Sequence, residues 1–279
     1  MKDYAPELHR RDQNSGLGPA LAACLRRLVL MGVTKKPLSS PSPTPARAVG
    51  ALLLSRPLST ADLRELLDEA GLNPGGDGTA LAVERGGMHV GLTVIERSLG
   101  GDGVLRNIHP ISATPPEVEA IVDHRAHVVI LAFGSADASV EVHELHAQVV
   151  AALADAPEVV GYAIDGTTWS ASALRDVVSE QAKLPVELWA PVWAWEGEAG
   201  TTAYSYGLSH FGGWEVQVVD AALGVEEAYV VLLELVHRVV TGVRLDDGAV
   251  VNTPSGVTAR VEAAAWVIDP TMPAWRLVF

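Results

Sequence analysis

The sequence predicts an α+β protein of two packed α/β lobes with mostly antiparallel sheets. Apolar residues make up 48% of the 279 residues, so a large core can be buried. Short apolar runs alternate with longer segments whose apolar residues recur every three or four positions, which indicates strands alternating with helices. The 26 Gly and 17 Pro indicate frequent turns.

Residues 1–47 are predicted to form a disordered basic leader ending in a linker rich in Pro and Ser. The linker, KKPLSSPSPTPAR at residues 35–47, has four Pro and three Ser and is expected to be extended. Residues 1–48 carry eight Lys and Arg against three Asp and Glu, a charge of +5. Because the whole chain has a net charge of −14, the remaining residues carry −19. An acidic body repels phosphate backbones, so no nucleic acid is expected on it, whereas a basic protein would complement its charge.

Residues 48–136 are predicted to form an N-terminal α+β lobe. Ser59 and Asp62 have the spacing of a capping box at a helix start. The segment Arg85-Gly86-Gly87 has the composition of a hairpin turn. The element order is βαββαβ, the plan of a ferredoxin-like lobe. The expected elements are a strand at Val49–Ser55, a helix after Ser59 that Gly71 ends, strands at Thr79–Glu84 and Met88–Ile95, a helix at Pro115–His124 and a strand at His127–Phe133.

Residues 137–279 are predicted to form a C-terminal α+β lobe with no internal repeat. Helices are expected at Ser139–Ala156, Ala171–Ala182 and Gly224–Thr241. Strands are expected at Val159–Ile164, Val186–Trp195, Thr201–Leu208, Trp214–Val219, Val243–Val251, Val257–Ile268 and Trp275–Phe279.

Composition also predicts a cytoplasmic location. Cys24 is the single Cys, which excludes an intramolecular disulfide and suits a reducing compartment. No apolar run reaches the roughly 18–20 residues that span a membrane, so no membrane contact is expected.

The candidate binding surface is an aromatic hairpin. In the run VELWAPVWAW at residues 186–195, alternate side chains, including the three Trp, fall on one face of a strand. If the next turn pairs Trp193 with Tyr204, the Tyr side chains join that face. An aromatic slab can bind a ligand or partner, but we expect the apolar helix Gly224–Thr241 to cover it as core. The candidate residues are Trp189, Trp193, Trp195, Tyr204 and Tyr206.

Two histidine pairs are weak candidates for metal ligands. His143 and His146 are three residues apart, so they share a face of the expected helix. His124 and His127 lie between a helix end and a strand start. The zincin motif requires a spacing of four, and neither pair has a nearby Cys. We therefore expect surface histidines in the first pair and boundary histidines in the second.

Recognisable catalytic motifs are absent. The chain has no GxSxG elbow, no phosphate-binding GxxxxGK[ST] loop and no GxGxxG after a strand, so no cofactor is expected. Glu196, Glu198, Asp246 and Asp247 lie in expected turns, where carboxylates are usually solvated. Catalysis is therefore not the expected activity.

The string Tyr204-Ser205-Tyr206-Gly207-Leu208-Ser209-His210-Phe211-Gly212, followed by Glu215–Val218, resembles the C-terminal region of the bacterial domain of unknown function 4261 family. Gly87-Met88 and His124–His127 are also similar to longer members. The resemblance spans about Val49 to Phe279. It implies a bacterial cytoplasmic protein and assigns no activity, cofactor or site residue.

Three functional hypotheses follow. The first is a protein-binding module, adaptor-like or immunity-like, whose acidic surface binds a basic protein. The second is a metal-dependent hydrolase that uses some of the four histidines. The third is a structural homo-oligomer, such as a homodimer formed through the aromatic face.

Overall fold

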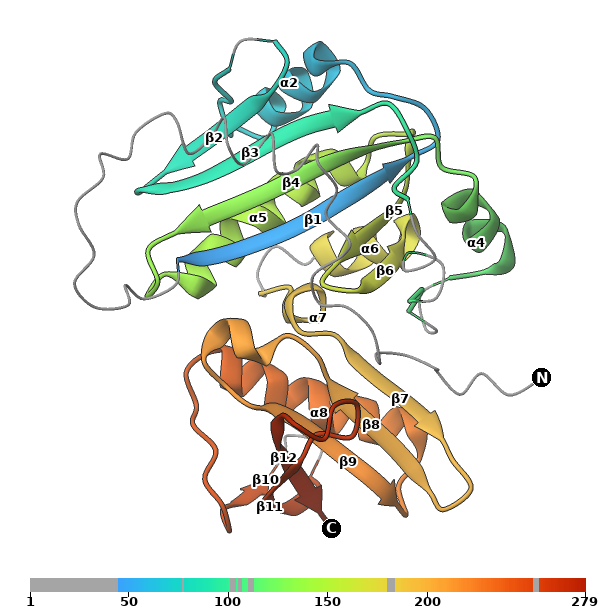
Figure 1. The fold of residues 1–279 in the computed structure, drawn as a ribbon, viewed down its shortest axis with the longest axis vertical. Coiled ribbons are helices and arrows are strands. Elements are labelled where there is room, and N and C mark those ends of the chain that lie inside the picture. Colours follow the sequence, from blue (N-terminus) through green and yellow to red (C-terminus); the bar gives the residue numbers. More distant parts are fainter. Residues whose placement is uncertain are drawn as a thin grey trace. The chain divides into compact units, whose positions relative to one another are not determined.

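The computed structural model describes residues 45–76, 78–100, 104, 107–109, 113–179, 184–252 and 256–279. The first of its two sheets is called sheet A. Its neighbouring strands are all antiparallel, in the order β2-β3-β4-β1-β5-β6 (Figure 1). The strands are β1 (Ala46–Leu54), β2 (Leu81–Arg85), β3 (Met88–Ile95), β4 (Ala126–Gly134), β5 (Val159–Ile164) and β6 (Thr167–Ser170).

Helices pack on both faces of sheet A. The helices are α2 (Thr60–Glu69), α4 (Pro115–Val122), α5 (Ser139–Ala154) and α6 (Ala171–Ser179). Helix α5 packs against α2, α6 and strands β1, β3 and β4. Ile121 of α4 packs with Leu53, whereas the adjacent Leu52 belongs to the larger core that contains the α5 side chains. Because successive strand residues point to opposite faces, α4 lies on the face opposite α5.

The ferredoxin-like arrangement of the first lobe is not confirmed. In that plan each helix connects two parallel strands. Here β4 and β3 lie between β1 and β2, and three successive antiparallel pairings make β1 antiparallel to β2. What the sequence predicted correctly is the coarser class, a mixed α/β protein with two mostly antiparallel sheets.

The first sheet extends past the lobe boundary predicted between residues 136 and 137. Strand β5 pairs with β1, and β6 pairs with β5. The physical reason is that β1 occupies an inner position and needs a partner on each side. The pairing therefore moves the boundary between the two sheets to beyond β6. At the other end, β1 begins at Ala46, before the predicted start of the body at Ala48, and the rest of the predicted leader, residues 1–44, lies outside the described residues.

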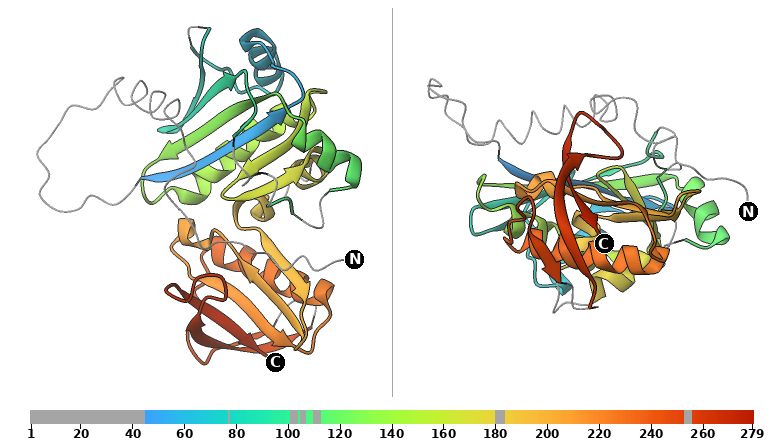
Figure 2. Two further views of the ribbon diagram at one scale, coloured as in Figure 1. Left: turned by 45° about the vertical axis from the view of Figure 1, so that its right-hand side comes forward. Right: turned by 90° about the horizontal axis from the view of Figure 1, so that it is seen from below.

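The second sheet, sheet B, has the order β10-β11-β12-β9-β8-β7, with β12 and β9 parallel and the other neighbours antiparallel. Its strands are β7 (Val192–Glu196), β8 (Thr201–Ser205), β9 (Glu215–Ala221), β10 (Val250–Asn252), β11 (Thr258–Ala265) and β12 (Pro273–Val278). Helix α8 (Val225–Val240) lies along one face of β7, β8 and β9 (Figures 1 and 2).

The predicted strand Val186–Trp195 is wrong in its first half. Residues Val186–Trp189 form a short helix, α7, and the strand begins only at Val192. The helix buries Trp189, which is 1% exposed, and its ring meets that of His143 of α5 in a T-shaped contact at a centroid distance of 5.8 Å. Alternation of apolar residues could not show this, because the run is equally apolar as a helix or a strand.

Two local predictions are confirmed. Ser59 and Asp62 form the capping box at the start of α2. Gly86 and Gly87, with φ of 57° and 81°, form the two-residue turn between β2 and β3. The short strand β6 was not predicted, although Asp165-Gly166 is a recognisable turn sequence of the same kind, with φ of 42° and 78°.

Among the described residues, no helix is long and apolar enough to cross a membrane.

The packing of β1 on β5 generates a stability prediction. A Cβ atom on Gly50 would lie 2.2 Å from the hydroxyl of Tyr162, which is fully buried. We expect Gly50→Ala to lower the free energy of unfolding by about 1–3 kcal/mol, because Tyr162 has no free space to move into. Urea denaturation measures this. Gly100→Ala is the control, since its Cβ would meet nothing within 4 Å, and equal stability of both variants would contradict the close approach.

Candidate binding surface

The register of the aromatic hairpin is as predicted. Strands β7 and β8 pair Trp193 with Tyr204 and Trp195 with Thr202. Tyr206 continues the pairing, because its N–H donates to the carbonyl of Pro191 at 3.0 Å. The candidate residues in these strands therefore share one face, which we call the aromatic face. Trp189 lies outside it, in α7.

The helix expected to cover the aromatic face lies on the other side of the sheet. Val192 and Ala203, which point away from Trp193 and Tyr204, pack in the same core as Val231 and Leu232 of α8. The prediction that Gly224–Thr241 buries the aromatic slab is therefore wrong. Helix α8 selects the aliphatic face because its own buried stripe is aliphatic, namely Ala228, Val231, Leu232, Leu235, Val236 and Val240.

The turn between β11 and β12 covers the middle of the aromatic face instead (Figure 1). Gln217 of β9 fixes this turn, since its side-chain NH₂ donates to the carbonyl of Ala265 at 2.8 Å and its Oε1 accepts from the N–H of Val267 at 2.7 Å. The turn thereby places Trp266 at the edge of the Tyr204 ring, with centroids 6.0 Å apart. Gln217 is 2% exposed, so both of its polar groups are satisfied in a buried position.

The cover is incomplete, and aromatic surface remains accessible. Tyr204 is 1% exposed, but Trp193, Trp195 and Tyr206 are only partly buried around it. We call these three residues the aromatic strip. Partly exposed aromatic side chains set around a rigid, buried base are typical of binding surfaces, because they add contact area at a low cost in conformational entropy.

The surroundings of the strip are acidic. Glu196 and Glu198 are exposed in and next to the turn after β7, and Asp220 is exposed on β9. The N–H of Asp220 lies 3.4 Å from the hydroxyl of Thr202, the residue paired with Trp195. Residues 184–237 contain no Lys or Arg at all. From elsewhere in the chain, Arg276 of β12 lies near Asp220, since its side chain donates to the carbonyl of Val219 at 3.2 Å. The three carboxylates outnumber this cation, and an excess of negative charge attracts cationic groups.

A buried carboxylate holds the chain that follows β8. Glu215 accepts hydrogen bonds from the hydroxyl of Ser205 at 2.7 Å and from the N–H of Gly207 at 2.9 Å. It also accepts from the backbone of Leu208 and Ser209, the start of the 3-10 helix η1 (Leu208–Phe211). Burial raises the pKa of Glu215, and these hydrogen bonds oppose the rise.

Gly207 is required at this position. Its φ is 117°, and a Cβ atom there would lie 2.5 Å from the carbonyl oxygen of Trp189. Within the string Tyr204–Gly212, Tyr204 is therefore a core residue, while Gly207 and the residues after it form a loop anchored by Glu215.

Removing this carboxylate should loosen the loop. We expect Glu215→Ala to lower the free energy of unfolding by about 2–4 kcal/mol, because several buried N–H groups lose their acceptor. Glu215→Gln should cost less, since its carbonyl oxygen still accepts. Urea denaturation at neutral pH measures the free energy of unfolding of both variants. Glu198→Ala, in an exposed turn, is the control, and a Glu215→Ala variant as stable as this control would rule out the anchoring role.

His109 connects the outer strands of the two sheets. Its backbone N–H donates to the carbonyl of Thr168 in β6 at 2.9 Å, and its ring Nε2 lies 2.8 Å from the carbonyl oxygen of Val192 in β7. The ring stacks on Trp169 at 4.6 Å and touches Trp193 at 5.0 Å. Burial lowers the pKa of His109, so the ring is neutral and Nε2–H is the donor to Val192.

A second polar contact joins η1 to sheet A. His210 lies 3.4 Å from the carboxylate of Asp165, in the turn between β5 and β6. The hydrogen bond to Asp165 raises the pKa of His210. The hydroxyl of Ser139, at the start of α5, donates to the carbonyl of His210 at 2.6 Å. The ring of His143 lies 5.8 Å from that of His210.

The four candidate metal ligands do not form one site. His127 shares the face of Leu53 with α4, whereas His143 and His146 belong to α5 on the other face. All four are buried, so the expectation of surface histidines on α5 is wrong. Their ring nitrogens serve local contacts: His124 Nδ1 with the Ile121 carbonyl, His127 Nδ1 with the Arg97 carbonyl, His143 Nδ1 with the Ser139 carbonyl and His146 with Ile130 and Tyr162. No group of three or more His, Cys, Asp or Glu residues suited to a metal ion occurs within the described ranges.

Buried histidines on α5 generate a pH dependence. Burial lowers the pKa of His146 to about 4 and also lowers that of His143, from 6.5. Between about 6.5 and 4 the unfolded chain therefore binds more protons than the folded protein, and the free energy of unfolding falls as pH falls. His210 acts oppositely, since its raised pKa adds stability below 6.5 that is lost as pH rises through the folded value.

We expect His146→Gln to reduce the loss of stability on acidification. The slope contributed by one titrating group is at most about 1.4 kcal/mol per pH unit. Urea denaturation of wild type and variant from pH 7 to pH 4.5 gives the two slopes. The slopes are compared rather than the absolute stabilities, because the substitution also changes packing. Identical slopes would show that His146 is not held neutral.

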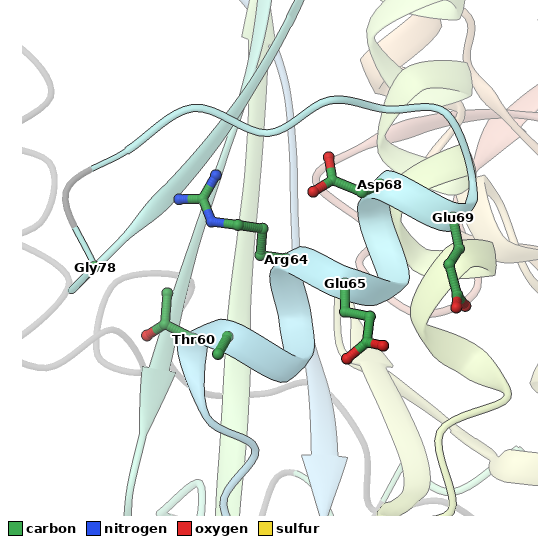
Figure 3. Close-up of a pocket in the computed structure, with 7 residues that line it drawn as sticks. Thr60, Arg64, Glu65, Asp68, Glu69 and Gly78 are labelled. Carbon is green, nitrogen blue, oxygen red and sulfur yellow. The ribbon is translucent and has the colours of Figure 1, made fainter.

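A hollow beside α2 has a volume of about 760 Å³. It is a weaker candidate for a binding site than the aromatic strip. In Figure 3, Glu65 and Glu69 point to one side of the helix and Arg64 and Asp68 to the other. Arg64 is already engaged, since it donates to the carbonyl of Pro74 at 2.6 Å. The side chains around this hollow therefore do not converge on a common ligand position.

The sequence predicted the residues of the aromatic strip but not the residues that hold the surrounding turns and strands in place. Gln217, Trp266, Glu215, His109 and the Asp165–His210 pair were not identified. Polar residues within apolar strands, such as Gln217, were the available indication, because a buried amide needs a fixed partner. Nothing in the sequence indicated that His109 and Asp165 would contact residues far along the chain.

No protein-family model, no curated protein and no solved structure matches this chain, so the resemblance to the domain of unknown function 4261 family stays a prediction.

Proposed function

We propose that the protein is a protein-binding module, adaptor-like or immunity-like, that uses the aromatic strip to bind a basic partner protein. The observation that carries the proposal is the placement of three partly exposed aromatic residues beside Glu196, Glu198 and Asp220, on a segment, residues 184–237, that contains no Lys or Arg. The aromatic rings supply contact area, and the negative field steers a cationic partner to it.

The local charges support a basic partner over an acidic or neutral one. Glu196, Glu198 and Asp220 surround the end of the strip that contains Trp195. An acidic partner would meet like charges there, which costs binding energy. The same repulsion acts between two copies of this chain, so a basic partner is favoured over a homodimer formed through the strip.

Peptide display tests this proposal. Random 15-residue peptides on phage are selected against the purified full-length protein at low salt. We expect enriched peptides with a net positive charge, whose Kd weakens by roughly tenfold when salt rises from low to above physiological concentration, because screening removes the steering charges.

Variants locate the site. Trp195→Ser and Glu198→Lys should each weaken binding of the selected peptide by about tenfold or more, since hot-spot residues commonly contribute at least 1–2 kcal/mol. Trp214→Ser is the matched control, because Trp214 is 41% exposed and stacks on Trp275, away from the strip. Peptides without charge preference, or equal loss in the control, would refute the proposed function.

A further inference from the structure

Strand β7 has an outer side that His109 engages at Val192 and that is open beyond it. It is the outermost strand of sheet B, next to β8. Pro191 accepts a hydrogen bond from the Tyr206 N–H, and the Gly197 N–H donates to the Gly200 carbonyl, so both residues direct these groups toward the return strand. Because alternate strand residues direct their N–H and C=O groups to the same side, Val192, Ala194 and Glu196 direct theirs outward.

One of these outward positions already has a hydrogen-bond partner within the chain. The carbonyl of Val192 accepts the hydrogen bond from the His109 ring. Beyond it, within the described part of the chain, Ala194 and Glu196 have no backbone partner on this side. The outward N–H and C=O groups of these two residues form a row that a further strand can pair with.

The other outer strands are covered or short. A bridge between Gly75 and Ala82 covers β2, and a bridge between Ile108 and Thr168 covers β6. Strand β10 has three residues, and the carbonyl of Asn252 at its end accepts from Arg238 at 2.8 Å. Natural proteins protect sheet edges in these ways, so the open side of the five-residue strand β7 is an exception within the described residues.

The open side borders the aromatic strip and the acidic residues. Trp195 lies between Ala194 and Glu196 in sequence and faces the aromatic side of the sheet. A strand added beside β7 would place alternate side chains next to Trp195 and next to α8. Glu196 and Glu198 would lie beside its end, where Lys or Arg of the added strand would be favoured.

We propose that β7 binds its partner by strand addition: an extended, Lys- or Arg-containing segment of a partner protein pairs with the outward groups of Ala194 and Glu196 and becomes the next strand of sheet B. This inference rests on the proposed function and adds the form of the ligand. Backbone hydrogen bonds supply affinity in this mode, while the strip and the acidic residues supply specificity.

A substitution at Ala194 separates backbone pairing from side-chain contact. Ala194→Pro removes the outward N–H without breaking a hydrogen bond between β7 and β8, and Pro is tolerated where a strand N–H has no ladder partner. Ala194→Ser is the matched control, since it changes the side chain and keeps the N–H. With the selected basic peptide as probe, we expect about tenfold weaker binding by Ala194→Pro and less than about threefold change for Ala194→Ser.

Amide hydrogen exchange of the unmodified protein provides the second measurement. The outward amides of Ala194 and Glu196 should exchange quickly in the free protein and become protected when the peptide is bound. Those of Trp193 and Trp195 should be protected in both states, because they pair with β8.

The outcomes are distinguishable. Loss of binding in Ala194→Pro together with new protection of Ala194 and Glu196 supports strand addition. Unchanged exchange of these two amides, with binding still lost in Trp195→Ser, overturns strand addition and leaves the proposed function standing. A selection that yields no basic peptide removes the proposed function, and the inference with it.

Discussion

The packing of α8 on the aliphatic face of sheet B is the interaction on which the candidate surface depends. Strands β7 and β8 have small apolar side chains, such as Val192 and Ala203, on one face and Trp193, Trp195 and Tyr204 on the other. A helix with an aliphatic stripe packs more densely on small side chains than on Trp and Tyr rings. With α8 in that place, the aromatic face is left to a short turn, and a turn covers less area than a helix.

That turn is itself held by polar groups inside an apolar setting. The amide of Gln217 satisfies two backbone groups at the base of the β11–β12 turn, and the carboxylate of Glu215 gathers the N–H groups at the start of η1. Buried polar groups of this kind are costly when unpaired, so they specify one backbone arrangement when paired. The aromatic strip is consequently presented on a fixed base, which lowers the entropy cost of binding.

The contacts between the two sheets involve histidines with opposite electrostatic behaviour. His109 is buried and neutral, and it uses one ring nitrogen for a backbone carbonyl and its ring face for Trp169. His210 is partly exposed and favours its charged form because of Asp165. One contact therefore depends on packing and the other on charge, and acidification affects them differently. The buried pair on α5 opposes protonation, so it contributes a loss of stability as pH falls.

Charge distribution and strand position together favour recognition of a basic segment. The net negative charge of the body supplies long-range attraction but no orientation. Orientation would come from β7, where the outward backbone groups, Trp195 and the adjacent glutamates lie within a few residues of one another. A folded basic surface could satisfy the charges but not the backbone row, which is why an extended segment suits this strand.

By itself, the sequence determined the features that depend on neighbouring residues. The capping box at Ser59, the hairpin turn at Gly86-Gly87, most strand and helix positions, and the pairing of Trp193 with Tyr204 all follow from local spacing and turn chemistry. Only the tertiary structure decided the strand order of sheet A, the placement of α8, the helical turn at Val186–Trp189 and the convergence of Asp165 with His210. The physical reason is that apolar alternation shows that a face is buried but does not show what buries it. Which segment buries a face depends on shape complementarity and on hydrogen bonding of buried polar groups, both between segments far apart in the chain.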